Sequence, residues 1–114
     1  MTINDLEEMD IVLRRDGKVC WVLRNETTKR LQTFLPDMWG QHELRHYYPN
    51  FKYGKYVRHY ALRDDNNDIL AVCKPRSKWK ALQLMHDYEA LRLQGNELAL
   101  KEFMKEFNWI NVYA

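Results

Sequence analysis

Apolar and polar residues alternate through the first third of the chain in the manner of short β-strands. Two apolar runs, 11–13 and 19–23, flank Asp16-Gly17, a dipeptide whose tolerance of positive φ angles suits a tight hairpin turn. After a polar turn, a third strand is expected over 30–35. This pattern predicts a three-stranded antiparallel meander at the start of the chain.

The middle of the chain indicates a short helix followed by a second hairpin. The helix is expected from about 38 to 48, where Asp37 would cap its start and Pro49 would close it. The alternating run 56–63 and the apolar run 69–73 are separated by a polar turn. Two such runs around a turn are typical of a β-hairpin.

Helical spacing replaces strand alternation in the last third of the chain. Ser77 is a suitable N-cap and Gly95 a suitable C-terminal stop for a first helix. Its apolar residues at near-helical spacing, expected to face the core, are Trp79, Leu82, Met85, Tyr88 and Leu91. A shorter helix that ends at Asn108 carries an apolar face of Leu100, Phe103, Met104 and Phe107. Residues 109–113 then favour a last strand.

These segments together predict an α+β fold that forms a single domain over 1–114. The sheet would be antiparallel, with five to six short strands from the N-terminal meander and the second hairpin, and the C-terminal helical pair would pack on one face. Cys20 and Cys73 lack close-spaced partners, so both are expected to be reduced and partly buried. No apolar run approaches the roughly 20 residues that span a bilayer, and the acidic N-terminus has no signal-peptide h-region. The sequence therefore predicts a cytoplasmic protein without membrane contact.

Charge is unevenly distributed, although the formal net charge is only +2. The first ten residues hold acidic but no basic side chains, whereas basic residues dominate 41–63 and 74–80. Segregated charge steers association with an acidic partner. Lys and Arg can neutralise phosphates and Tyr can stack on bases, but Tyr and Arg also anchor protein interfaces. The candidate partner-binding residues are Arg45, Tyr47, Tyr48, Lys52, Tyr53, Lys55, Tyr56, Arg58, Lys74, Arg76, Lys78 and Lys80.

The segment His42-Glu43-Leu44-Arg45-His46 is an H-E-x-x-H sequence that resembles the signature of zincin metallopeptidases. On a helix, His42 and His46 would lie one turn apart and could share a Zn²⁺ ion, while Glu43 could deprotonate a metal-bound water. No third ligand is marked by a motif, and the alternatives for it are Glu89, His59 and His86. One hypothesis is therefore a minimal zinc-dependent hydrolase. If the segment does not bind zinc, we expect no cofactor and no catalytic residue in this chain.

The opening of the chain, residues 9–18 followed by 19–23, resembles the start of small proteins encoded by phages and prophages of Gram-positive bacteria. In those proteins an acidic leader precedes the hairpin of a small β domain. The resemblance implies an accessory phage protein, a class that includes anti-CRISPR proteins and other inhibitors that occupy a functional surface of their target.

The leading hypothesis is a non-enzymatic binding or inhibitor protein of this type. It would engage a host protein or ribonucleoprotein, such as a nuclease, through the basic and aromatic residues named above. Binding of single-stranded nucleic acid without a protein partner is a further alternative. The sequence leaves the oligomeric state open.

Overall fold

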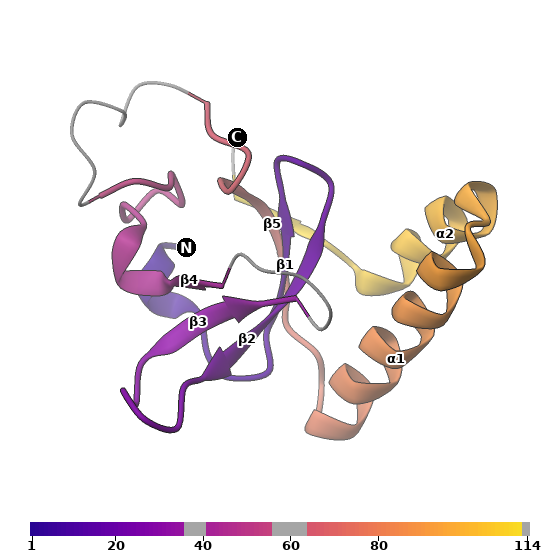
Figure 1. Cartoon of the computed structure of the whole chain (residues 1–114), viewed down its shortest axis with the longest axis horizontal. Helices are drawn as coiled ribbons and strands as arrows, with labels where there is room; N and C mark the ends of the chain where they lie inside the picture. Colours follow the sequence, from indigo (N-terminus) through magenta and orange to yellow (C-terminus); the bar gives the residue numbers. More distant parts are fainter. Residues whose placement is uncertain (36–40, 56–63, 113–114) are drawn as a thin grey trace.

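The fold is built on one antiparallel sheet (Figure 1). The structure, a computed structural model, describes residues 1–35, 41–55 and 64–112. The strands are β1 (Ile11–Arg14), β2 (Val19–Arg24), β3 (Leu31–Phe34), β4 (His42–Glu43), β5 (Ile69–Cys73) and β6 (Ile110–Asn111). The α-helices are α1 (Lys78–Gln94) and α2 (Glu97–Phe103), and the 3₁₀ helices are η1 (Ile3–Asp5), η2 (Leu44–His46) and η3 (Met104–Phe107).

The strand order is β4-β3-β2-β1-β5-β6, and each pair of neighbours is antiparallel. The predicted meander is confirmed as β1, β2 and β3, and the α+β class is confirmed. β5 was predicted to be the second strand of a hairpin, and its two neighbours in the sheet are β1 and β6. The other predicted strand of that hairpin, 56–63, lies outside the described residues.

The turn between β1 and β2 differs from the predicted one in its backbone conformation. Gly17 has a φ of +85°, whereas Asp16 keeps a negative φ. The Gly17 N–H donates to the Arg14 carbonyl at 2.9 Å, and the Arg14 N–H donates to the Lys18 carbonyl at 2.9 Å. This is a three-residue hairpin loop in which glycine forms the bulge after an ordinary turn.

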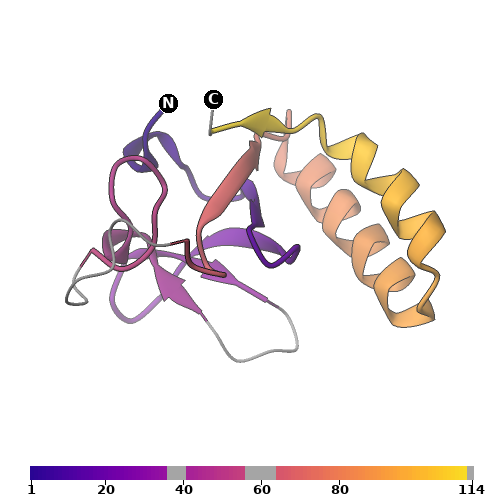
Figure 2. The ribbon, with the colours of Figure 1, turned by 90° about the horizontal axis from the view of Figure 1, so that it is seen from above.

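The two faces of the sheet bury different side chains, because successive residues of a strand point to opposite sides. The helices α1 and α2 lie together beside the sheet (Figure 2). One core cluster joins the strands to α1 and η3 and contains Ile11, Val19, Cys73, Leu84, Met85, Tyr88 and Phe107. The other joins them to the N-terminal segment and to the chain around η2, and contains Ile3, Leu6, Val12, Cys20, Val22, Leu35, Leu44, Tyr47, Phe51, Ile69 and Val72. The sheet is therefore covered on both faces.

The ends of α1 agree with the prediction, but its buried face does not. The Ser77 hydroxyl accepts a hydrogen bond from the Lys80 N–H at 3.1 Å, and Gly95 ends the helix with a φ of +71°. The residues that α1 buries are Ala81, Leu84, Met85 and Tyr88. Trp79 is 77% exposed and Leu82 is 46% exposed, so the prediction that they lie in the core is wrong. None of the helices in the described ranges is long and apolar enough to cross a membrane.

The predicted helix over 38–48 is wrong for the part that the structure describes, from residue 41 onward. Residues 36–40 lie outside the described residues. His42 and Glu43 extend the sheet as β4, with His42 opposite Thr33 of β3. The Thr33 hydroxyl lies 3.3 Å from the His42 backbone nitrogen and 3.4 Å from its carbonyl oxygen. Pairing with β3 thus satisfies backbone groups that a helix would have satisfied internally.

Candidate binding surface

The described tyrosines of the predicted basic and aromatic segment are buried or half-buried in the fold. Tyr47 is only 1% exposed, and its hydroxyl donates to the Asn67 carbonyl at 2.8 Å. Tyr53 is half-buried, with its ring centroid 5.2 Å from that of Tyr47, and Tyr48 is also half-buried. Two further candidates, Tyr56 and Arg58, lie outside the described residues. The described tyrosines therefore do not form an open aromatic surface.

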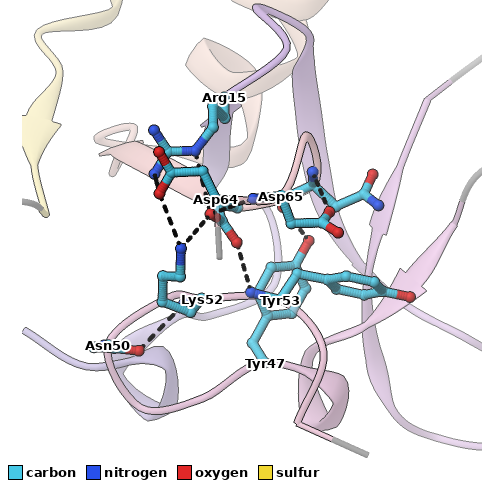
Figure 3. A network of polar contacts seen from close by, with 9 residues as sticks. Arg15, Tyr47, Asn50, Lys52, Tyr53, Asp64 and Asp65 are labelled. Carbon is cyan, nitrogen blue, oxygen red and sulfur yellow. Dashed lines mark hydrogen bonds and ion pairs between the residues drawn. The ribbon is translucent and has the colours of Figure 1, made fainter. Parts of the chain in front are cut away.

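Lys52, another predicted binding residue, is held in an internal ion-pair network (Figure 3). Its side chain is 11% exposed, and its Nζ lies 3.0 Å from Asp68 Oδ2 and 3.2 Å from Asp64 Oδ1. Burial by itself lowers the pKa of Lys52, but the hydrogen bonds to the two carboxylates outweigh it, so the pKa is raised. Lys52 therefore serves the fold.

Asp68 is the centre of this network and is fully buried. Its carboxylate accepts hydrogen bonds from the backbone N–H groups of Tyr53 at 2.8 Å and Asp65 at 2.9 Å. Arg15 Nε adds a third donor at 3.2 Å, besides Lys52. Burial raises the pKa of Asp68, but these donors outweigh it and hold the pKa below its ordinary value. The network fixes segments that are far apart in sequence.

Arg45 and Lys55 are exposed on the opposite side of the sheet from α1. Together with Arg30 and Leu44 they line a shallow hollow. Arg45 pairs with Glu43, and Arg30 lies 3.7 Å from the same carboxylate. The acidic side chain offsets part of the positive charge, so this patch is a weaker candidate for binding an anion.

The H-E-x-x-H residues do not have the helical geometry on which the zinc hypothesis depends. His42 lies in β4 and His46 ends the single turn of η2. The His42 ring packs 4.6 Å from the Tyr53 ring, and burial, followed by the charge of Arg14, lowers the pKa of His42. Within the described ranges, no group of three or more His, Cys, Asp or Glu side chains is arranged to hold a metal ion.

We expect protein purified without added metal to contain far less than one zinc per chain. The physical reason is that His42 is packed against an aromatic ring, while Glu43 accepts ion pairs from Arg30 and Arg45. Elemental analysis of the purified chain beside a His42→Ala variant checks this. Stoichiometric zinc that disappears in the variant would restore the hydrolase hypothesis.

Of the basic run before and within the start of α1, Lys74 also serves the fold. Its Nζ lies 2.6 Å from an Asp10 carboxylate oxygen and donates to the Asp5 carbonyl at 2.9 Å. These contacts tie the end of β5 to the N-terminal segment. Reversing the charge of Lys74 would therefore disturb folding as well as any binding.

Arg76, Lys78 and Lys80 are different, because all three are exposed. Their side chains form no ion pair or hydrogen bond with any residue that the structure describes. They surround the first turn of α1, where the partial positive charge of the helix N-terminus adds to their own. Positive charge is therefore concentrated here without serving the stability of the helix.

A hollow of about 550 Å³ lies beside this turn, and we call it the α1 hollow. Its basic lining consists of Arg76, Lys80 and Lys74, of which Lys74 is paired with Asp10. Leu84 and Phe107 are buried beneath it, and Ile110, which is 43% exposed, adds an apolar edge. The arrangement can accept a carboxylate or phosphate against the cations and an apolar group against the floor.

Acidic side chains lie close to the same turn. Lys78 shares a small depression with Glu7 and Glu8 of the N-terminal segment. Glu106 lines the α1 hollow together with the cations. The surface around the start of α1 is thus mixed in charge.

The exposed position of Trp79 and Leu82 on the outward side of α1 differs from the predicted core face. Trp79 and Leu82 line a further shallow hollow with Gln83 and His86. The sequence contained a signal for this, because Ala81, Leu84, Met85 and Tyr88 follow the i, i+3, i+4, i+7 spacing of a core stripe more closely than the set that included Trp79. If that stripe faces the sheet, Trp79 and Leu82 must face away.

Comparison with known proteins found no matching family model, no matching curated protein and no matching solved structure.

Proposed function

We propose that this chain is a non-enzymatic binding protein that recognises an acidic and apolar segment of a partner protein in the α1 hollow. The observation that carries the proposal is the position of Arg76 and Lys80, two exposed cations without internal partners among the described residues, beside an apolar floor. A carboxylate of the partner would bind between the two cations. A neighbouring apolar side chain would cover Ile110 and the floor.

The charge distribution favours a protein partner over a nucleic acid. Nucleic-acid interfaces are much more positively charged than protein interfaces and rely on phosphate neutralisation. Here Glu7 and Glu8 adjoin Lys78, and Glu106 lines the α1 hollow. A continuous phosphate backbone would meet these carboxylates, whereas a folded partner can place its own charges to suit them.

The chemistry of the nucleophilic side chains supports a role without catalysis. Cys20 and Cys73 are buried, and burial raises the pKa of Cys20 to about 12 and that of Cys73 to about 11, so their thiolates do not form near neutral pH. Ser77, the single serine in the sequence, uses its hydroxyl as the cap of α1. Each of these side chains already has a structural use.

The resemblance of the opening residues to phage accessory proteins gives the proposal its concrete form. In that form the partner is a host defence nuclease or nucleoprotein, and the chain inhibits it by occupying an acidic surface. An inhibitor of this kind needs a stable scaffold and one complementary surface, and no reacting groups.

Reversing two charges in the α1 hollow is expected to remove the partner. The variant Arg76→Glu/Lys80→Glu puts carboxylates where the partner's acidic groups would bind, which costs several kcal/mol through like-charge contact. Affinity capture from a lysate of the native cells, followed by mass spectrometry, compares this variant with the unaltered chain. The matched control is Lys29→Glu/Lys101→Glu, which changes the net charge equally at exposed positions away from α1's first turn.

A protein recovered by the unaltered chain and the control, but lost with the hollow variant, supports the proposal. Capture is repeated after nuclease treatment of the lysate, and the recovery should not change. Equal recovery with all three chains contradicts the assignment of the α1 hollow. Recovery that nuclease abolishes would point to nucleic-acid binding instead.

A further inference from the structure

The face of α1 that points away from the sheet carries a stripe of exposed side chains, which we call the outer stripe. Its members are Trp79, Leu82, His86, Ala90 and Leu93. Trp79 is 77% exposed, Leu82 46% and Leu93 72%. The stripe runs over 14 residue steps, or about 21 Å of helix. The residues that α1 buries lie on the opposite side.

An apolar stripe on both sides of one helix is unusual for a surface helix, which normally keeps its outward side polar. Trp79 and Leu82 also form a shallow hollow with His86. Exposed apolar surface on a side that the core does not use marks an interaction site. The core uses the other side of α1, so the fold does not require these residues.

We propose that the outer stripe binds the outer stripe of a second copy of this chain, with the two α1 helices antiparallel. The spacing of the stripe supports this occupant, because it is symmetric about His86. Leu82 and Ala90 each lie four positions from His86, and Trp79 and Leu93 each lie seven positions from it. A twofold axis through His86 therefore places Trp79 against Leu93 and Leu82 against Ala90, as an isologous interface requires.

The helix dipoles are aligned favourably in the same arrangement, because antiparallel helices place the N-terminal end of each α1 beside the C-terminal end of the other. The axis through His86 sets Lys78, eight positions before it, opposite the uncharged Gln94 of the other copy, eight positions after it.

This interface is separate from the α1 hollow. Lys80 follows Trp79 by about 100° around the helix, on the side away from the outer stripe. Dimerisation would thus leave both hollows open, so the dimer would present two copies of the proposed partner site. The inference goes beyond the proposed function and stands or fails independently of it.

Sedimentation velocity across a concentration series tests the proposal on the full chain. A single helix pair is smaller than a standard interface of about 800 Å² per partner, so we expect a dimer with micromolar affinity. Leu93→Asp should weaken dimerisation about tenfold or more, because the dimer would bury an unpaired carboxylate. Leu98→Asp is the matched control, since Leu98 is 74% exposed but lies on α2; it should change the dissociation constant less than about twofold.

A cysteine at position 86 tests the antiparallel register. His86→Cys should form an interchain disulfide under mild oxidation, because a twofold axis brings the two copies of this position together. Leu98→Cys should not, and the native cysteines are buried. A chain that stays monomeric at the highest concentration, or a dimer that Leu93→Asp leaves intact, would overturn the proposal. Cross-linking through position 98 in place of 86 would overturn the register.

Discussion

Replacing Asp68 by Asn is expected to lower the free energy of unfolding by about 3–5 kcal/mol, the usual result of removing one partner of a buried ion pair. Asp68 is fully buried and receives hydrogen bonds from Lys52, Arg15 and two backbone N–H groups. Asn keeps the size of the side chain but removes the charge. The ammonium of Lys52, whose side chain is 11% exposed, would then lack its main counter-ion.

Urea denaturation followed by circular dichroism measures this loss. The matched control is Asp64→Asn, which alters a carboxylate of the same network that is 72% exposed. Exposed ion pairs contribute about 1 kcal/mol or less, so the control should differ little from the unaltered chain. Equal losses in the two variants would contradict the view that the buried carboxylate organises the network.

The same network predicts how stability depends on pH. Because the pKa of Asp68 is lowered in the folded state, its contribution is present above the unfolded-state pKa of about 3.9 and disappears as the pH falls through the lower folded-state value. Because the pKa of Lys52 is raised, its contribution is present below about pH 10.4 and disappears as the pH rises through the higher folded-state value. The Asp68→Asn variant should therefore lose less stability below pH 4 than the unaltered chain. If the free energy of unfolding of the variant and of the unaltered chain fell equally between pH 5 and pH 2, this expectation would be contradicted.

As a separate single change, Phe107→Ala is expected to lower the free energy of unfolding by about 3–5 kcal/mol, as truncation of a buried phenylalanine usually does. Phe107 is 1% exposed and forms the centre of an aromatic group. Its ring is stacked on Trp109 with centroids 4.8 Å apart, and it meets Phe103 and Tyr88 edge-on at 5.6 Å and 6.2 Å. Removing it leaves a cavity beside Tyr88 of α1, Phe103 of α2 and Trp109.

Thermal or urea unfolding measures this effect, and near-ultraviolet circular dichroism reports the aromatic packing. Leu98→Ala is the control, because Leu98 is 74% exposed and should change stability by less than about 0.5 kcal/mol. A loss below about 1 kcal/mol for Phe107→Ala would be outside the range for a buried phenylalanine. That result would mean that η3 does not pack as described.

Features set by local sequence were predictable. The meander follows from apolar runs separated by short turns, and α1 begins and ends where Ser77 and Gly95 predict. The helix face at Leu100, Phe103 and Phe107 also packs toward the core as its spacing predicts. In each case the relevant residues are neighbours in sequence, so their pattern alone determines the structure.

Features set by tertiary pairing were not predictable. Residues 42–43 join the sheet because β3 offers an edge, which local helix signals do not reveal. Lys52 and Lys74 looked like surface cations, but their partners Asp68 and Asp10 are 16 and 64 residues away. The choice of buried face on α1 likewise depends on which stripe the sheet accepts. Among the basic candidates that the structure describes, only Arg76, Lys78 and Lys80 are exposed and have no ion pair with another described residue.

The most direct test of the α1 hollow as a binding site is a photo-cross-linking amino acid placed at position 80. Irradiation in the presence of the captured partner should yield an adduct, and mass spectrometry should place the cross-link in an acidic and apolar segment of that partner. The same amino acid at position 29, an exposed lysine on the β2–β3 connection, should yield none. Cross-linking from position 29 with none from position 80 would contradict the account.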